Sequence, residues 1–140
     1  MSTSTIPIET ATYGGYGGKS FKDSHDIEAW GQITKIIIRH GNEIDGITVT
    51  YNDGTTTTHG GNGGNQSVIN LERGEYISKV EGRAGSRLDY LYFHTSRGKE
   101  YGPFGKKGGN PFDCNFGSKG LVYFFGRAGN RIDQIGFAYA

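Results

Sequence analysis

Three aspartates of the chain share one short pattern, in which a glycine stands four residues before the Asp and an apolar residue directly before it. They are Asp45, Asp89 and Asp133, which recur at an interval of 44 residues. A carboxylate that follows a glycine turn and begins a strand is held on a rigid support. It can accept hydrogen bonds from neighbouring hydroxyl groups, and such charge-assisted bonds are stronger than neutral ones.

Each of these patterns has a glycine cluster as its counterpart. The clusters are residues 14–18, 60–64 and 102–109. Glycine lets the backbone come close to a ligand and take positive φ, while its N–H group stays free to donate. A carboxylate on one side and backbone donors on the other form a small site that suits a pyranose, because vicinal hydroxyls both give and accept hydrogen bonds.

A hairpin pattern connects each Asp to its cluster. After Asp45, two strand-like runs around the turn 52–54 lead into the cluster 60–64. This order predicts a β-hairpin that ends in a glycine loop. The same order follows Asp89, so we expect the two loops of each repeat to lie side by side.

The third repeat is divided between the two ends of the chain. After Asp133 only one strand-like run remains, residues 134–139, whereas residues 6–13 are strand-like and lead into the cluster 14–18. We therefore expect the last strand to pair with the first. A period of this size indicates repeated units, so the chain is expected to form a closed threefold molecule.

The rest of the chain also favours strands. Further strand-like runs lie at residues 33–39, 66–70, 76–82 and 121–125, and residues 19–31 predict a loop with one short strand. No segment shows a 3.6-residue apolar period over ten or more residues, so the fold class is all-β. Residues 1–140 are expected to form a single domain. Three equivalent sheets would make a prism, with apolar faces inside and the loops at its ends.

Composition excludes several classes of partner. The net charge of +1 gives no general attraction to nucleic acid. No run of 18 apolar residues exists, so no membrane insertion is expected, and the first 13 residues lack the features of a secretion signal. We expect a cytoplasmic or non-classically exported protein. The single cysteine, Cys114, excludes an internal disulfide and is expected to be a small buried side chain.

No catalytic or metal-binding constellation is visible. The four histidines have no metal-ligand spacing, and none pairs with a Ser or Cys nucleophile; they are His25, His40, His59 and His94. The three aspartates lie in separate repeats, which argues against an acid/base pair. Residues 14–20 resemble a phosphate-binding loop but are one residue too short. We therefore expect no enzyme activity and no cofactor or metal.

Taken together, the motifs resemble the jacalin-related lectins over essentially the whole chain. The resemblance rests on the glycine-rich start at 13–18, on Trp30 before an isoleucine-rich strand, on residues 44–47 leading to Tyr51, on residues 101–105, and on the last Gly-x-x-x-Asp. It implies the β-prism I fold, with three Greek-key sheets of four strands around a pseudo-threefold axis. It also implies a carbohydrate-binding lectin.

The resemblance implies where sugar would bind. In the family, the Asp takes sugar O4 and O6, amides of the Asp loop reach O5 and O6, and a glycine-loop amide reaches O3. The first implied site consists of Gly15, Gly129, Asn130, Arg131 and Asp133. The second consists of Gly60 or Gly61 with Gly41, Asn42, Glu43 and Asp45. The third Asp loop supplies Gly85, Ser86, Arg87 and Asp89.

The third site stays open at this point, because its cluster 102–109 is longer than the others and Pro103 has no amide hydrogen to donate. The resemblance also implies the sugar class. Galactose-specific members are cleaved so that a glycine becomes the amino terminus, whereas here residues precede Gly14 without interruption. We therefore expect mannose- or glucose-type glycans, bound at two or three sites per chain.

Two alternatives accompany this reading. Arginines recur beside two Asp loops, at Arg83, Arg87, Arg127 and Arg131. They are either solvated charges or contacts for acidic, for example sulfated, glycans, because a guanidinium suits sulfate and carboxylate groups. A β-prism can also serve as a module that binds a protein partner. Since single sugar contacts are weak, we expect a homodimer or higher homo-oligomer that increases avidity.

Overall fold

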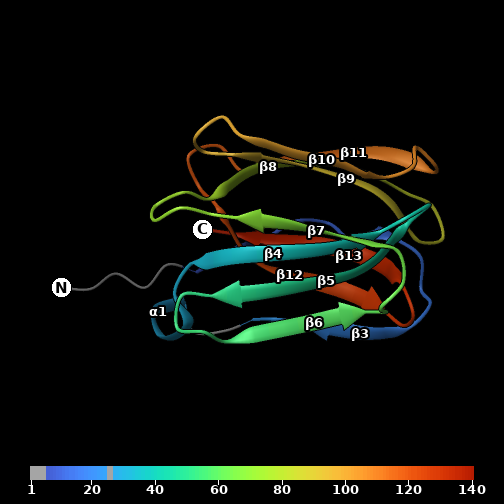
Figure 1. Cartoon of the computed structure of the whole chain (residues 1–140), viewed down its shortest axis with the longest axis horizontal. Helices are drawn as coiled ribbons and strands as arrows, with labels where there is room; N and C mark the ends of the chain where they lie inside the picture. The colour runs from blue at the N-terminus through green and yellow to red at the C-terminus, as the bar shows by residue number, and fades with distance from the viewer. Residues whose placement is uncertain (1–5, 25–26) are drawn as a thin grey trace.

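The computed structural model describes residues 6–24 and 27–140, and this part of the chain forms three antiparallel sheets (Figure 1). The first sheet contains β1 (Ile8–Glu9), β2 (Tyr13–Gly14), β3 (Lys19–Lys22), β12 (Leu121–Ala128) and β13 (Ile132–Tyr139). The second contains β4 (Ile33–His40), β5 (Ile44–Tyr51), β6 (Thr56–Gly60) and β7 (Asn65–Asn70). The third contains β8 (Ile77–Ala84), β9 (Leu88–Thr95), β10 (Glu100–Gly105) and β11 (Asn110–Asn115).

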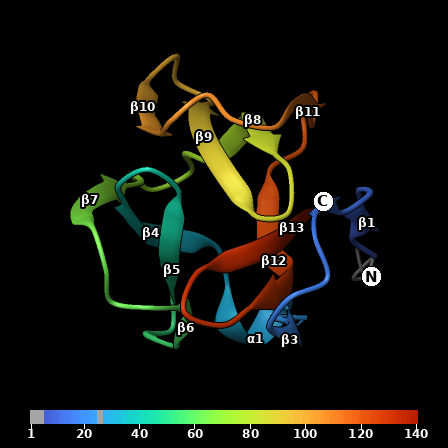
Figure 2. The same ribbon diagram turned by 90° about the vertical axis from the view of Figure 1, so that its right-hand side faces the viewer.

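The sheets share one topology. The second sheet has the order β6-β5-β4-β7 and the third β10-β9-β8-β11, so the fourth strand of each returns to lie beside the first. This is a Greek key. Seen end-on, the three sheets surround a common centre (Figure 2). The predicted all-β prism with three Greek-key sheets is confirmed.

The first sheet is completed by both ends of the chain, as predicted from the divided repeat. β1 and β2 both pair with β13, with Ile8 opposite Tyr139 and Gly14 opposite Gln134. They form one interrupted outer strand, so this sheet also has four strand positions. At the interruption, the Phe137 amide donates to the Thr10 hydroxyl, while the Thr10 amide donates to the Phe137 carbonyl.

The apolar side chains of the central strands fill the middle of the prism. The fully buried ones include Ile36, Ile38, Val49, Leu91, Phe93, Phe124, Ile135 and Phe137. Alternate residues of a strand point to opposite faces, so each central strand contributes every second side chain to this core. Because all three sheets share the core, it fixes the relative position of the loops at each end.

Two elements were not predicted from the sequence. β11 carries Pro111 and alternates only Phe112 and Cys114 as apolar residues, so it reads as a turn rather than a strand. It forms because it is an outer strand paired only with β8, where proline is tolerated. The helix α1 (Ile27–Trp30) lies within the predicted loop 19–31, whose short strand is confirmed as β3.

Two further observations concern the burial of Cys114 and the length of the helices. Cys114 is 6% exposed, which agrees with the expected small buried side chain. Within residues 6–24 and 27–140, no helix has the length and apolar character needed to cross a bilayer.

Candidate functional site

The Asp loops and the glycine clusters lie together at one end of the prism, the end that faces the viewer in Figure 2. Each Asp loop connects the two central strands of a sheet, and each cluster connects the two outer strands. The sheet register places the first glycine of a cluster opposite the residue that follows the Asp. The pairs are Gly14 with Gln134, Gly60 with Gly46, and Gly105 with Tyr90. The predicted pairing of loops is confirmed.

The last two glycines of the first and second clusters lie against the Asp carboxylate, as does Gly108 of the third. A Cβ atom on Gly17 would be 2.7 Å from Oδ1 of Asp133, and one on Gly18 would be 2.7 Å from Oδ2. No side chain fits there, because real Cβ atoms do not approach other atoms so closely. The corresponding distance is 2.6 Å for Gly64 to Asp45 Oδ2, and the contacts are looser at 3.3 Å for Gly63 to Asp45 Oδ1 and 3.4 Å for Gly108 to Asp89 Oδ2.

The second residue of each cluster is tied to the Asp backbone. Its amide donates a hydrogen bond to the carbonyl oxygen of the Asp in the same site. The bonds measure 2.9 Å from Gly15 to Asp133, 2.8 Å from Gly61 to Asp45, and 3.0 Å from Lys106 to Asp89. The amides of these three residues therefore hold the cluster in place, and two of them belong to residues predicted to contact sugar.

This bond also shows where the third cluster begins. Lys106 occupies the position of Gly15 and Gly61, so the third cluster is residues 105–109 and has the same five-residue length as the others. The prediction of a longer third cluster is wrong. Gly102, Pro103 and Phe104 belong to β10, where the register shifts between Tyr101 and Phe104. The missing amide of Pro103 consequently has no bearing on this site.

In each repeat, one arginine donates hydrogen bonds to the backbone carbonyls of the last two glycines of the cluster. In the second repeat, Nε of Arg39 donates to the Gly63 carbonyl at 3.1 Å and Nη2 donates to the Gly64 carbonyl at 3.1 Å. The other two repeats contain the same pair of bonds, from Arg83 to Gly108 and Gly109, and from Arg127 to Gly17 and Gly18. The rigid guanidinium fork matches two adjacent carbonyls. These three arginines thus position the glycines that face each Asp.

Each Asp loop also reaches into the site of a neighbouring repeat. Nε of Arg131, in the first loop, is 3.2 Å from Oδ1 of Asp45, in the second. Nε of Arg87, in the third loop, is 3.9 Å from Oδ1 of Asp133 in the first. Glu43 occupies the same loop position in the second repeat and accepts contacts from both arginines, at 3.5 Å from Arg87 and 3.4 Å from Arg131. The three sites are therefore joined by charged side chains.

Asp89 has a different charged neighbour from the other two aspartates. Asp45 lies beside Arg131 and Asp133 beside Arg87, whereas Glu43 acts on Asp89. Burial raises the pKa of Asp89, and the charge of Glu43 raises it further. A hydrogen bond from the Gly85 backbone and the charges of Arg83 and Arg87 act in the opposite direction. The carboxylate of the third site is thus harder to ionise than an ordinary Asp.

The prediction that no histidine pairs with a serine is wrong, because Nε2 of His40 lies 2.7 Å from the Ser67 hydroxyl. Two other histidines contact carboxylates. His59 contacts Asp23 at 2.8 Å and stacks on Phe21, and His94 contacts Glu81 at 2.9 Å. Within the described ranges, no three His, Cys, Asp or Glu side chains are grouped so that they could hold a metal ion. His25 lies outside the described residues.

All fifteen predicted site residues lie at this end of the prism, and they fall into three groups, one per repeat. Sequence reasoning missed the glycines that contact the carboxylates, which are Gly17, Gly18, Gly63, Gly64 and Gly108. It also missed Lys106 and the positioning role of Arg39. The signal was available, because Arg39, Arg83 and Arg127 are spaced 44 residues apart. Whether these groups contact sugar stays a prediction.

Known proteins share this architecture. A model of the jacalin-like lectin domain matches residues 10–138. Zymogen granule membrane protein 16 of Rattus norvegicus is 37% identical over 126 residues, which cover 88% of this chain and 74% of that protein. Griffithsin of Griffithsia sp. is 31% identical over 128 residues, which cover 91% of this chain and 93% of that protein.

A solved structure agrees with these sequence matches. The mannose-specific jacalin-related lectin from Morus nigra, solved in complex with mannose, superposes with a TM-score of 0.85 at 30% identity. The alignment covers 100% of this chain and 98% of that one.

Proposed function

The chain belongs to the jacalin-like lectin domain family, and from this membership we propose that it recognises mannose- and glucose-type glycans at three sites on one end of the prism, without a metal ion. The family consists of carbohydrate-binding domains, so the chain is a lectin rather than an enzyme. Our proposal goes beyond family membership in three respects, which are the sugar class, the residues that bind the sugar and the number of sites.

The observation that carries the proposal is the contact between each Asp carboxylate and the glycines at the end of its cluster. The side chains of Asp45 and Asp133 are 11% and 13% exposed, so each is held firmly with one edge toward solvent. In the proposed complex, this edge accepts the hydroxyls O4 and O6 of a pyranose. Amides of the Asp loop donate to O5 and O6.

We assign the donor for sugar O3 to the last glycine of each cluster rather than the second residue. The amides of Gly15 and Gly61 already donate to the Asp carbonyls. Gly18 and Gly64 lie against the carboxylate itself and have positive φ values of 69° and 73°. This assignment differs from the sequence-based one and predicts which amides respond to sugar.

Three sites are proposed because the third repeat has the same construction as the other two. The five-residue cluster 105–109, the Lys106 amide bond and the Arg83 contacts repeat the arrangement of the first two sites. The preference for mannose over galactose follows from O4, because an axial O4 points away from the Asp. Residues of β1 and β2 precede Gly14 in a continuous chain, so this glycine has no free amino group.

An amide-resolved NMR titration tests this proposal. We would titrate methyl α-mannoside and then methyl α-galactoside in the presence of a chelator. We expect shifts at Gly18, Gly64 and Gly109 and at their Asp residues with the mannoside only. Matched Asp→Asn substitutions at positions 45, 89 and 133 should each abolish the response of one site and leave the fold intact. Unchanged amides with both sugars would contradict the proposal and favour a protein partner.

We also propose that copies of the chain associate through β1. This strand lies at the edge of the first sheet, and it presents Ile8, which is 44% exposed, next to Ile6, which is 83% exposed. An edge strand with exposed apolar side chains favours pairing with another chain. Sedimentation of the unmodified chain and of the Ile6→Ser, Ile8→Ser variant is the test. Equal sedimentation of both as monomers would contradict this proposal.

A further inference from the structure

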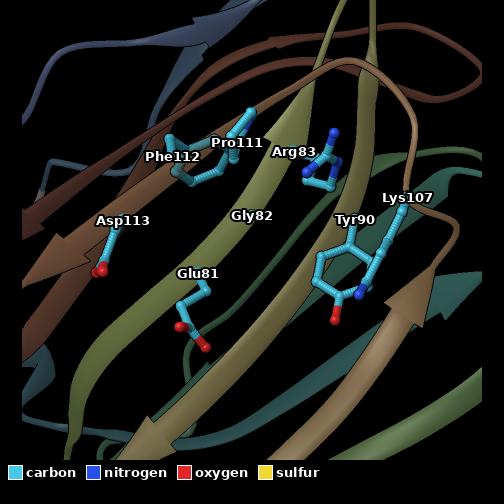
Figure 3. A pocket seen from close by; sticks show the side chains of 8 residues that line it. All are labelled: Glu81, Gly82, Arg83, Tyr90, Lys107, Pro111, Phe112 and Asp113. Atoms are coloured by element: carbon cyan, nitrogen blue, oxygen red, sulfur yellow. The ribbon is translucent and has the colours of Figure 1, made fainter.

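A groove on the outer face of the third sheet adjoins the Asp89 site (Figure 3). Its volume is about 490 Å³, within the range of roughly 300–1,000 Å³ that is typical of ligand pockets. The groove and the Asp89 site share the cluster 105–109, because Lys107 lines the groove and Arg83, which also lines it, holds Gly108 and Gly109. A ligand in the site can therefore extend into the groove.

One aromatic ring, that of Tyr90, lines the groove, as Figure 3 shows. Phe112 lies opposite Gly82, on the same face of β11 as the buried Cys114, and its ring points toward the core. The Phe112 ring stacks on Tyr13 at a centroid distance of 4.1 Å and lies 6.1 Å from the ring of Phe137, so it supports the floor of the groove from the inside. Tyr90, the residue after Asp89, therefore supplies the apolar face on which a sugar can pack.

The acidic side chains of the groove have basic neighbours. Glu81 contacts His94 at 2.9 Å and Lys79 at 3.7 Å, and Asp113 contacts Lys79 at 3.7 Å. Figure 3 shows these two carboxylates toward one part of the groove and Arg83 and Lys107 toward the other. The basic part faces the Asp89 site through the shared cluster.

The lysines of the cluster are not neutralised. In the part of the chain that the structure describes, neither Lys106 nor Lys107 lies within 4.0 Å of a carboxylate oxygen. Both are exposed. The groove therefore has unpaired positive charge where it meets the sugar site, which favours an anionic ligand.

The other two repeats lack these charges, although their backbones are equivalent. Lys106 and Lys107 correspond to Gly61 and Asn62 in the second cluster and to Gly15 and Tyr16 in the first. The first sheet has a similar hollow of about 430 Å³, whose lining includes Lys22 and Arg127, but Lys22 is paired with Glu9 at 2.8 Å and Arg127 holds its glycine cluster as Arg83 does. The cationic cluster is thus specific to the third site.

We propose that this groove is a subsite for an acidic sugar residue of a glycan bound at Asp89. A hexose occupies the Asp89 site, and the adjoining residue lies on Tyr90 with its sulfate, phosphate or carboxylate group at Lys107 and Lys106. This inference rests on the proposed function, since it requires sugar to bind at Asp89. It assigns acidic glycans to one site of three.

The test compares α-1,2-mannobiose with the same disaccharide sulfated on its reducing residue, by amide-resolved NMR titration. At the Asp89 site we expect about 5-fold tighter binding of the sulfated form, the upper range for one exposed ion pair. Amides of Gly82, Tyr90 and Phe112 should shift with the sulfated form only. High salt should remove the difference, because it screens exposed charges.

Variants copied from the second repeat make the test specific. Lys106→Gly with Lys107→Asn should reduce the ratio of the two dissociation constants at Asp89 to about one. The matched control is Arg73→Asn with Lys119→Asn, which removes two charges at the opposite end and should keep the ratio. Methyl sulfate alone should bind more weakly than the sulfated disaccharide.

The outcomes separate this inference from the proposed function. If neutral mannobiose shifts no Asp-loop amide, the proposed function fails and the subsite fails with it. If neutral mannobiose binds at Asp89 but sulfation gives no gain, or gives a gain without shifts at Gly82, Tyr90 and Phe112, only the subsite is refuted. Equal affinity for methyl sulfate and the sulfated disaccharide would likewise refute it.

Discussion

Arg131 belongs to the Asp loop of the first repeat, yet its Nε lies 3.2 Å from Oδ1 of Asp45 in the second. The repeats are thus not three independent sites on a common support. The residue two positions before each Asp acts on the Asp of a neighbouring repeat. Arg87 acts in this way on Asp133, and Glu43 acts on Asp89. A substitution in one loop should therefore be detected in another.

Arg131→Gln is expected to weaken sugar binding at the Asp45 site. The arginine donates a hydrogen bond to that carboxylate and orients it, and a partly exposed ion pair of this kind corresponds to about 2- to 5-fold in affinity. Site-resolved NMR titration with methyl α-mannoside measures it. As a control, Arg73→Gln removes the same charge at the opposite end of the prism. A loss confined to Gly18 and Asp133 would show that Arg131 acts only within its own loop.

Binding at the Asp89 site should be lost first as the pH falls. Its folded-state pKa is raised by burial and by Glu43, so its carboxylate gains a proton above the usual pH range of an Asp. Only the ionised form accepts both sugar hydroxyls. Glu43→Gln removes one cause of the shift and should move the midpoint of binding to lower pH. Titrations at several pH values would measure both midpoints, and identical midpoints in the two proteins would rule out a role for Glu43.

Arg39→Lys should loosen the glycine cluster of the second site although it retains the positive charge. A lysine cannot donate two parallel hydrogen bonds to the Gly63 and Gly64 carbonyls as the guanidinium does. We expect faster hydrogen exchange at Gly64 and weaker sugar binding at that site only. Arg127→Lys provides the matched variant for the first site. Unchanged exchange at Gly64 in Arg39→Lys would mean that the cluster is held by the other contacts.

Gly61→Ala should lower the free energy of unfolding by about 1–3 kcal/mol, which is typical of overpacking. Its Cβ atom would lie 2.3 Å from the Asn130 carbonyl oxygen, at the contact between the second cluster and the first Asp loop. Gly41→Ala is the control, because the nearest atom to its Cβ is 3.8 Å away. Denaturant unfolding compares them. Equal free energies of unfolding for the two variants would show that the second cluster and the first Asp loop can move apart without loss of stability.

The three pairs of loops could be predicted because the signals that define them are local. A glycine four residues before each Asp and the alternating strands lie within single segments of sequence, and the common 44-residue interval relates these segments to one another. The pairing of β13 with the amino-terminal strands followed from counting, since the third hairpin lacked its second half. The repeats thus indicated which distant segments pair, which a single sequence does not otherwise show.

Contacts between repeats could not be predicted in this way. That Arg131 reaches Asp45 depends on how three sheets pack around a shared core, and no spacing within one repeat encodes it. The start of the third cluster was misplaced for a different reason. Gly102 and Pro103 have the composition of a loop, whereas the structure places them in β10, and the Lys106 amide bond shows that the cluster begins at Gly105.

The closure of the first sheet by both ends of the chain sets the order in which the sites can form during synthesis. β13 pairs with β1 and β2, so Gln134 must meet Gly14 across almost the whole sequence. The second and third sheets are each built from one continuous segment and can assemble as they leave the ribosome, because amino-terminal segments emerge and fold first. The Asp133 site waits for the last strand, and the Asp45 site acquires its Arg131 contact only when the same segment is in place.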